Sequence, residues 1–249
     1  MALRVLILGG TAEASALAGG AVAAGHDVLT SLAGRTSRPA LPAGRVRIGG
    51  FGGPEGLAAF LDAERIDALV DATHPFAATI SANAERACRL RPTPRLMLLR
   101  PAWTRQDGDR WLDAGDMAEA ARLLPAGARV FLAVGRQELD AFAGRPDTWF
   151  LLRVVDPPEA PPPLARHELV LGRGPFRLED ELALLARHRI GWIVAKNAGG
   201  EGSGAKLAAA RRLGLPVVMV RRPGPPPGPR VPSAEGALDW LAALPPPHA

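Results

Sequence analysis

The sequence predicts an α/β protein built from two Rossmann-like, doubly wound parallel-sheet domains with an interdomain cleft. Short apolar, β-branched runs alternate with helical patterns, the connections between them are short, and the alternation stops at Arg100-Pro101 before it starts again. Alternating strands and helices form parallel sheets with right-handed crossovers. We therefore expect one domain over residues 1–101 and a second over 102–249, with a ligand in the cleft between them.

The first domain is expected to follow the strand–helix alternation closely. Its predicted strands are Arg4–Leu8, Asp27–Leu32, Arg45–Ile48, Ala68–Asp71 and Arg95–Leu99. Its predicted helices are Ala12–Ala24, Leu57–Glu64 and Ile80–Leu90. The middle helix carries apolar residues at the i, i+3, i+4 spacing, which is typical of a helix with one buried face.

The second domain repeats this organisation. Its predicted strands are Arg129–Val134, Trp149–Val155, Glu168–Leu171, Trp192–Ala195 and Val217–Val220. Its predicted helices are Met117–Leu124, Gln137–Phe142, Leu178–His188, Ala205–Leu213 and Ala234–Leu244. The proline-rich segments Pro157–Pro163 and Pro223–Pro229 cannot be helical and are expected to be loops.

Composition excludes several classes of protein. The 249 residues suffice for a substantial core, and no apolar run reaches the length of about 18 residues that a membrane span needs. The amino-terminal apolar run ends in a glycine turn, so it is interpreted as a core strand and not as a secretion signal. The single cysteine, Cys88, excludes an internal disulfide and a zinc cluster. We expect a cytoplasmic protein without a metal site.

The charge pattern favours small anionic ligands over nucleic acid. The formal net charge is +5, and the basic residues are scattered along the chain. There is no tyrosine, and no basic stretch is interleaved with the seven phenylalanines. A stacking platform for nucleic acid is therefore not expected.

The turn Gly9-Gly10-Thr11 lies between a predicted strand and an Ala-rich helix. Glycines allow the backbone to approach a phosphate closely, and the helix N-terminus offers it free N–H groups. The dinucleotide-binding pattern is G-x-G-x-x-G, whereas here the glycines are adjacent and a third is missing. An ordinary glycine turn, as found in any α/β protein, explains this segment equally well.

The end of the second strand favours NADPH over NADH. An NAD site usually places an acidic residue there to bind the ribose 2′-hydroxyl. The segment from Leu29 to Arg38 contains no acid but includes Ser31, Arg35 and Thr36. Guanidinium and hydroxyl groups bind a 2′-phosphate well. The alternative is a solvated basic loop.

Two further turns follow predicted strands. The glycine-rich run Gly49–Gly53 could line a ligand without obstruction by side chains, or it is simply a flexible turn. In the segment Asp71–Ala77, Thr73 and His74 fall where a nicotinamide ring or a substrate would lie. Histidine can donate a proton near neutral pH, although a lone histidine is more often a capping or packing residue.

The second domain has a counterpart in the glycine-rich segment Lys196–Lys206. Because Ala205 separates Gly204 from Lys206, the segment lacks the Gly-Lys-Ser/Thr succession of a nucleoside triphosphatase. A glycine-rich helix start with two lysines still suits carboxylates or phosphates. Arg136 and Arg173 fall at the same edge of the predicted sheet. For each arginine, the alternative is an ordinary surface charge.

Taken together in their order along the chain, these motifs resemble the precorrin-6A reductase family of cobalamin biosynthesis. The matching segments are Ile7–Thr11 with Glu13, Ser31–Arg35, Gly49–Gly53, Asp71–Ala77, Gly135–Leu139, Lys196–Gly200 and Leu213–Val218. The set spans nearly the whole chain, which is far more specific than any single motif. One departure is Ala198, where a serine is expected, so a hydroxyl contact is not expected from that position.

The resemblance implies an NADPH-dependent reduction of one carbon–carbon double bond, C18=C19, in a macrocyclic tetrapyrrole. A hydride would go to one ring carbon and a proton to its neighbour, giving precorrin-6B. Such a substrate carries many carboxylates and is large and flat, which matches basic groups around a gap between two domains. No metal is required. We expect a monomer or a weak homo-oligomer.

The resemblance also assigns roles to individual residues. The pyrophosphate and its ribose would be held by Gly9, Gly10, Thr11, Ala12 and Glu13, and the 2′-phosphate by Ser31, Arg35 and Thr36. The nicotinamide would lie near Gly50, Thr73 and His74. Substrate carboxylates would be received by Arg136, Lys196, Gly199, Gly200 and Lys206. His74 and Lys196 are the candidate catalytic proton donors, with water or a substrate carboxyl group as alternatives.

Two other functions compete with this interpretation. A short-chain dehydrogenase, or another NADPH reductase of a polyanionic small molecule, would share the first domain. Short-chain dehydrogenases normally use a Tyr-x-x-x-Lys pair, and this chain has no tyrosine. A redox sensor that binds NADPH without turnover would also share the first domain, but the basic, glycine-rich loops of the second domain argue against it.

Overall fold

The computed structural model describes residues 2–34, 41–158, 160–200 and 202–245. The chain forms two compact units, one from Met1–Pro101 together with Pro223–Ala249 and the other from Ala102–Arg222. Two α/β units with parallel sheets confirm the predicted fold class. The boundary predicted for the second domain was wrong at its end, because residues after 222 return to the first unit.

Unit 1 is a six-stranded parallel sheet in the order β12-β5-β4-β1-β2-β3. The strands are β1 (Arg4–Leu8), β2 (Asp27–Leu32), β3 (Arg45–Ile48), β4 (Ala68–Asp71), β5 (Arg95–Leu98) and β12 (Arg230–Val231). The direction of strand order reverses between β1 and β4. In open α/β sheets, ligands bind outside the carboxyl ends of the strands at such a reversal.

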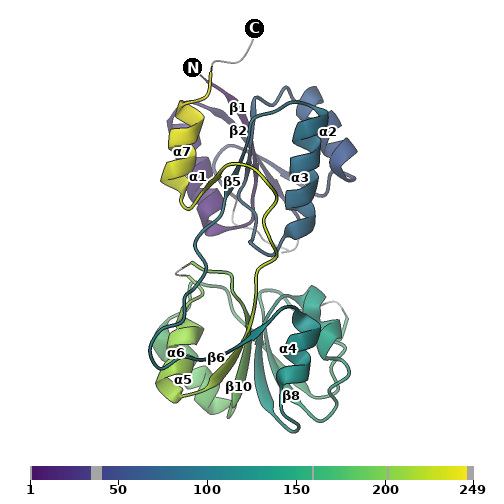
Figure 1. The fold of residues 1–249 in the computed structure, drawn as a ribbon, viewed down its shortest axis with the longest axis vertical. Coiled ribbons are helices and arrows are strands. Elements are labelled where there is room, and N and C mark those ends of the chain that lie inside the picture. Colours follow the sequence, from purple (N-terminus) through teal and green to yellow (C-terminus); the bar gives the residue numbers. More distant parts are fainter. Residues whose placement is uncertain (1, 35–40, 159, 201, 246–249) are drawn as a thin grey trace. The chain divides into compact units, whose positions relative to one another are not determined.

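Helices cover both faces of this sheet (Figure 1). They are α1 (Ala12–Ala23), α2 (Pro54–Ala63), α3 (Ala78–Leu90) and α7 (Ala234–Ala242). Along β1 the side chains alternate between two cores: Val5 and Ile7 lie in the cluster that includes residues of α1 and α7, whereas Leu6 and Leu8 lie in the cluster with residues of α2 and α3. A strand buried on both faces explains the uninterrupted apolar run in the sequence.

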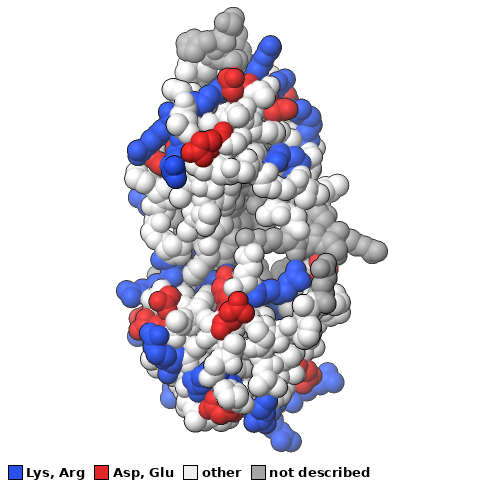
Figure 2. All heavy atoms as spheres, turned by 90° about the vertical axis from the view of Figure 1, so that its right-hand side faces the viewer, with Lys and Arg blue, Asp and Glu red and all other residues white. Residues whose placement is uncertain are grey.

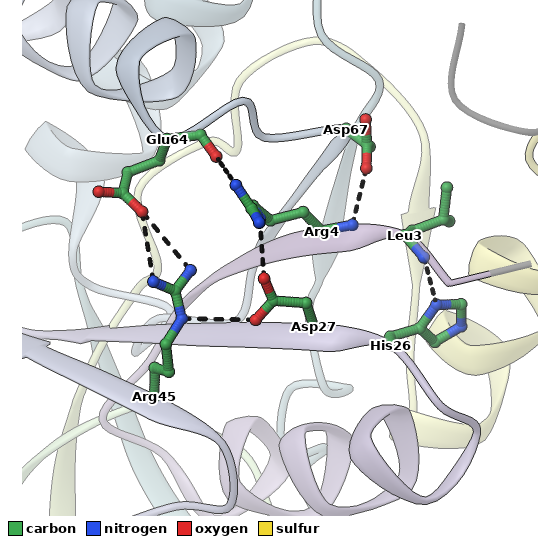
Figure 3. A network of polar contacts seen from close by, with 7 residues as sticks. All are labelled: Leu3, Arg4, His26, Asp27, Arg45, Glu64 and Asp67. Carbon is green, nitrogen blue, oxygen red and sulfur yellow. Dashed lines mark hydrogen bonds and ion pairs between the residues drawn. The ribbon is translucent and has the colours of Figure 1, made fainter. Parts of the chain in front are cut away.

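A polar network joins the amino ends of the strands (Figure 3). Asp27 accepts a 2.7 Å hydrogen bond from Nε of Arg4 and forms an ion pair with Arg45 at 3.4 Å. Asp67 accepts a 2.7 Å bond from the backbone N–H of Arg4, and Glu64 forms a 3.5 Å ion pair with Arg45. The network therefore ties β1, β2, β3 and the start of β4 together at the end of the sheet opposite the strand carboxyl ends.

Unit 2 is a second six-stranded parallel sheet, in the order β6-β11-β10-β7-β8-β9. Its strands are β6 (Arg110–Ala114), β7 (Arg129–Ala133), β8 (Trp149–Val154), β9 (His167–Leu171), β10 (Trp192–Lys196) and β11 (Pro216–Val220). Its helices are α4 (Met117–Leu123), the 3₁₀ helix η1 (Arg136–Phe142), α5 (Leu178–Arg187) and α6 (Ala205–Leu213). Here the strand order reverses between β7 and β10.

The two sheets exchange their outermost strands. The strand β6 follows β5 in the chain but pairs with β11 of unit 2, whereas β12 follows β11 but pairs with β5 of unit 1. Helix α7 then packs on α1 through Ala237 and Leu241. Neither exchanged strand was predicted from the sequence, and η1 was predicted as an ordinary helix.

The surface carries both signs of charge. Figure 2 shows basic side chains interspersed with acidic ones over the face that it presents. None of the helices in the described part of the chain is long and apolar enough to cross a bilayer.

Candidate cofactor and substrate sites

The turn after β1 contains two positions that favour glycine. Its first residue, Gly9, donates a 2.9 Å hydrogen bond to the carbonyl oxygen of Ser31 on β2, and a Cβ added there would lie 2.7 Å from Cγ2 of Thr30. Gly10 has a φ of +105°, which a residue with a side chain rarely adopts. The turn is therefore held against β2 by the Gly9 hydrogen bond, and its two glycines add no side chains of their own.

Thr11 connects the two sides of the strand-order reversal. Its Oγ1 accepts a 3.1 Å hydrogen bond from the N–H of Ala14, which caps the N-terminus of α1. The same hydroxyl donates a 2.8 Å bond to the carbonyl oxygen of Ala72, just beyond β4. The helix that begins at Ala12 thus presents its free N–H groups and its positive dipole end at the reversal point.

The turn after β4 is organised by a buried carboxylate. Oδ1 of Asp71, a fully buried residue, accepts bonds from the hydroxyl of Thr73 at 2.7 Å and from its N–H at 3.2 Å. His74 follows directly, and its Nδ1 accepts a 3.3 Å bond from the N–H of Phe76. That bond leaves Nε2 as the nitrogen that carries the proton of the neutral ring. Thr73 and His74 thus follow directly after Ala72, the residue to which Thr11 is bonded, and their contact with a nicotinamide ring or a substrate stays a prediction.

Glu13 lies on the first turn of α1 but is already engaged. One of its carboxylate oxygens is 2.7 Å from Nη1 of Arg100, and both side chains are largely buried. A contact between Glu13 and a ribose stays a prediction, and it would share the carboxylate with Arg100.

Beside the end of β2, on the neighbouring strand β3, lies a basic residue that was not predicted as part of the site. Ser31 is buried, and its Oγ accepts a 2.9 Å bond from Nη1 of Arg47 on β3. Burial lowers the pKa of the Arg47 guanidinium from its ordinary value. The signal in the sequence was an arginine two residues before the glycine run that starts at Gly49. Arg35 and Thr36, predicted to bind the 2′-phosphate, lie outside the described residues.

In unit 2 an ion pair spans the strand-order reversal. Nζ of Lys196, the last residue of β10, lies 2.7 Å from Oε1 of Glu138 on η1. A Cβ at position 135 would come within 2.6 Å of the other carboxylate oxygen of Glu138, so Gly135 makes room for this pair. Arg136 begins the same 3₁₀ helix and is exposed. The structure therefore gathers Lys196 and Arg136 at the carboxyl ends of β7 and β10.

The loop after β10 is fixed by Trp103. The Asn197 side chain accepts a 2.8 Å bond from the N–H of Trp103 and donates a 3.0 Å bond to its carbonyl oxygen. The Trp103 indole N–H donates a 2.9 Å bond to the carbonyl of Gly200. Gly199 and Gly200 both have positive φ, at +65° and +79°. Ala198, the departure from the family pattern, is buried.

Lys206 lies inside unit 2. Its side chain donates to the carbonyl of Ser203, and its ammonium is 4.8 Å from the centre of the Trp103 ring. Burial, with a smaller contribution from the positive charge of Arg153, lowers the pKa of Lys206 to about 8, while Glu181 opposes the shift. The residue is only 6% exposed, so the predicted contact with a substrate carboxylate would require it to leave these partners.

The sites fit a dinucleotide in unit 1. A tight glycine turn, a capped helix N-terminus and a guanidinium at the end of the neighbouring strand are the groups that diphosphates and ribose phosphates require. The fold and this turn define a dinucleotide-binding α/β protein of the doubly wound class.

The chain belongs to the family described as "Precorrin-6x reductase CbiJ/CobK", which matches residues 4–242. Membership in this reductase family implies a nicotinamide cofactor. A protein of Rhodococcus erythropolis named "Precorrin-6A reductase" is 51% identical over 97% of this chain and 98% of its own length. A Rhodobacter capsulatus protein of the same name is 48% identical over 96% of each chain. The solved structure titled "CobK precorrin-6A reductase" superimposes with a TM-score of 0.93 at 47% identity, covering 97% of this chain and 96% of the other.

Proposed function

We propose that this chain catalyses the NADPH-dependent reduction of the C18=C19 bond of precorrin-6A to give precorrin-6B. The observation that carries the proposal is the turn Gly9–Thr11, joined to Ala72 at the strand-order reversal, in a chain 51% identical to a relative named "Precorrin-6A reductase". The relative's name supports this choice of substrate, and the turn supports a dinucleotide bound at the end of β1.

The preference for NADPH rests on the end of β2. The sequence from Leu29 to Arg38 contains no acidic residue to bind a ribose 2′-hydroxyl, and Ser31 is paired with the guanidinium of Arg47 instead. Arg35 and Thr36 would add a further charge and a hydroxyl in the following loop. A 2′-phosphate would be attracted by these groups, whereas NADH would gain nothing from them.

When bound, NADPH supplies the hydride for the reduction. The backbone of Gly9 to Thr11 and the N-terminus of α1 would hold the pyrophosphate, while Gly50, Thr73 and His74 would lie near the nicotinamide end. His74 in its imidazolium form is a candidate to deliver the proton from Nε2 to the neighbouring ring carbon and would return to the neutral ring, and the ammonium of Lys196 is the other candidate.

The substrate is proposed to bind at the carboxyl ends of β7 and β10. Arg136 and Lys196, with the backbone N–H groups of Gly199 and Gly200, would receive its carboxylates. We propose that the macrocycle is free of cobalt. Relatives at 48–51% identity are named "Precorrin-6A reductase", whereas a Priestia megaterium protein named "Cobalt-precorrin-6A reductase" is 29% identical.

The proposal is tested by following the nicotinamide absorbance of NADPH in the presence of the purified protein. We expect the absorbance to fall only when precorrin-6A is added, and NADH to be used far more slowly at equal concentration. If NADPH binds but is not consumed, a redox sensor without turnover is the better description.

A further inference from the structure

Arg47 differs in its surroundings from the other arginine of β3. Arg45 lies at the amino end of the strand and belongs to the network of Figure 3, where it pairs with Asp27 and Glu64. Arg47 lies one pleat further along, directly opposite Ser31 in the register of β2 and β3. Carboxylates neutralise Arg45, whereas carbonyl and hydroxyl oxygens surround Arg47.

The guanidinium of Arg47 is held rigidly. Nη1 donates to Oγ of Ser31 at 2.9 Å and to the carbonyl of Gly49 at 3.0 Å, and Nη2 donates to the carbonyl of Gly50 at 3.0 Å. The centre of the guanidinium lies 3.9 Å above the Phe51 ring and 5.0 Å from that of Phe60. Neutral oxygens and aromatic rings orient the group, and none of the carboxylates in the described ranges forms an ion pair with it.

Two of its N–H groups are left for a ligand. A guanidinium has five N–H groups, and within the residues that the structure describes Arg47 uses three of them. The Nε–H and one Nη2–H form no hydrogen bond there. They belong to neighbouring nitrogens, which together can bind two oxygens of one phosphate.

The position matches one part of the cofactor. Ser31 is near the end of β2, where an acidic residue binds the adenosine ribose in NAD sites, and it also anchors the glycine turn through its carbonyl oxygen. A positive, oriented fork bonded to this serine lies within reach of a ribose 2′-phosphate. On this basis, and resting on the NADPH dependence proposed above, we infer that Arg47 is a specificity-determining residue that binds the 2′-phosphate of the cofactor from β3.

The test uses two probes that differ only in that phosphate: adenosine 2′,5′-bisphosphate and adenosine 5′-monophosphate, each titrated calorimetrically into the full chain. We expect the wild type to prefer the bisphosphate. Arg47→Met should weaken binding of the bisphosphate roughly 10- to 150-fold, as expected for a lost charged hydrogen bond, and should change binding of the monophosphate less than about twofold. Arg45→Met is the matched control and should alter neither affinity.

Other results would overturn the inference. If Arg47→Met weakens both probes equally, Arg47 only shapes the Gly49–Gly50 turn; if it weakens neither, Arg47 does not contact the phosphate. Arg47→Lys retains the charge without the fork and provides a second variant that preserves folding; it should lose part of the bisphosphate preference, and full retention would contradict a two-point contact. A wild type without any preference for the bisphosphate would instead contradict the NADPH proposal itself.

Discussion

The hydroxyl of Thr11 donates a 2.8 Å hydrogen bond to the carbonyl oxygen of Ala72, and the two residues are 61 positions apart in the chain. Because Thr11 also caps α1, one side chain fixes both the helix N-terminus and the turn after β4. These are the two parts of unit 1 between which a dinucleotide would lie. The relation makes Thr11 the first position to test.

Thr11→Ala should lower both stability and cofactor affinity. Loss of an N-cap costs about 1 kcal/mol, and the Ala72 carbonyl also loses its partner. We expect a lower midpoint in denaturant unfolding and weaker NADPH binding by calorimetry. Thr11→Ser retains the hydroxyl and should behave much like the wild type. Equal behaviour of Thr11→Ala and Thr11→Ser would show that the hydroxyl does not matter.

His74→Ala should slow turnover while the fold stays intact. A positioned general acid accelerates proton transfer by roughly 100-fold or more, so kcat should fall by a similar factor while the NADPH dissociation constant changes little. Steady-state kinetics and unfolding curves measure the two effects separately. An unchanged kcat would remove His74 from the proton transfer and leave Lys196, water or the substrate as the donor.

Lys196→Ala should raise the KM for precorrin-6A, with little effect on NADPH binding. A carboxylate that loses a charged hydrogen bond binds roughly tenfold more weakly or worse. Glu138→Gln is the companion variant, because it keeps the size of the side chain but removes the charge that orients Nζ of Lys196. It should raise KM less than Lys196→Ala does. If Lys196→Ala changes the NADPH affinity instead, the lysine belongs to the cofactor site.

Because of Lys206, the free energy of unfolding should increase as the pH rises above 8. Burial lowers its folded pKa from 10.5 to about 8, so between these values the unfolded chain binds the proton and the folded chain does not. Stability therefore increases across this window. Because one pH unit between the two pKa values corresponds to about 1.4 kcal/mol, the gain is on the order of 3 kcal/mol.

The comparison with Lys206→Met isolates this effect. Burial also raises the pKa of Cys88 to about 11 from 9.0, which by the same reasoning removes stability above pH 9. Cys88 contributes equally in Lys206→Met and in the wild type, so its contribution cancels in the difference between their unfolding free energies. We expect the variant to be at least as stable as the wild type at pH 7, with its advantage disappearing by pH 10.5. If the difference in unfolding free energy stays constant from pH 7 to pH 10.5, folding does not lower the pKa of Lys206.

Most elements of the fold were predictable because each carries a local pattern. The apolar run of β1 and the glycine turn that ends it identify the start of a dinucleotide-binding unit without any knowledge of distant residues. The strands β6 and β12 carry no such pattern. The strand β6 lies at a sheet edge and is only partly buried, and β12 has only two residues after a proline-rich loop. Pairing with strands far away in the chain decides which sheet each of them belongs to.

The candidate site divides in the same way. Thr11 and Thr73, in turns after strands, and Lys196, the last residue of β10, could be proposed as site residues because their position along the chain reveals the sheet edge. Arg47 and Glu138 could not, because their importance arises from partners across the sheet, Ser31 and Lys196, that only the strand order brings together. The burial of Lys206 likewise depends on distant partners in the fold, including Trp103.

The most direct test of the account is hydride transfer from labelled cofactor. NADPH deuterated at the transferable position of its nicotinamide ring is incubated with precorrin-6A and the protein, and the product is analysed by mass spectrometry and NMR. We expect precorrin-6B with one deuterium on a carbon of the reduced C18=C19 bond, formed only when the protein is present. An unlabelled reduced product, or labelled NADPH that stays unconsumed, would contradict it.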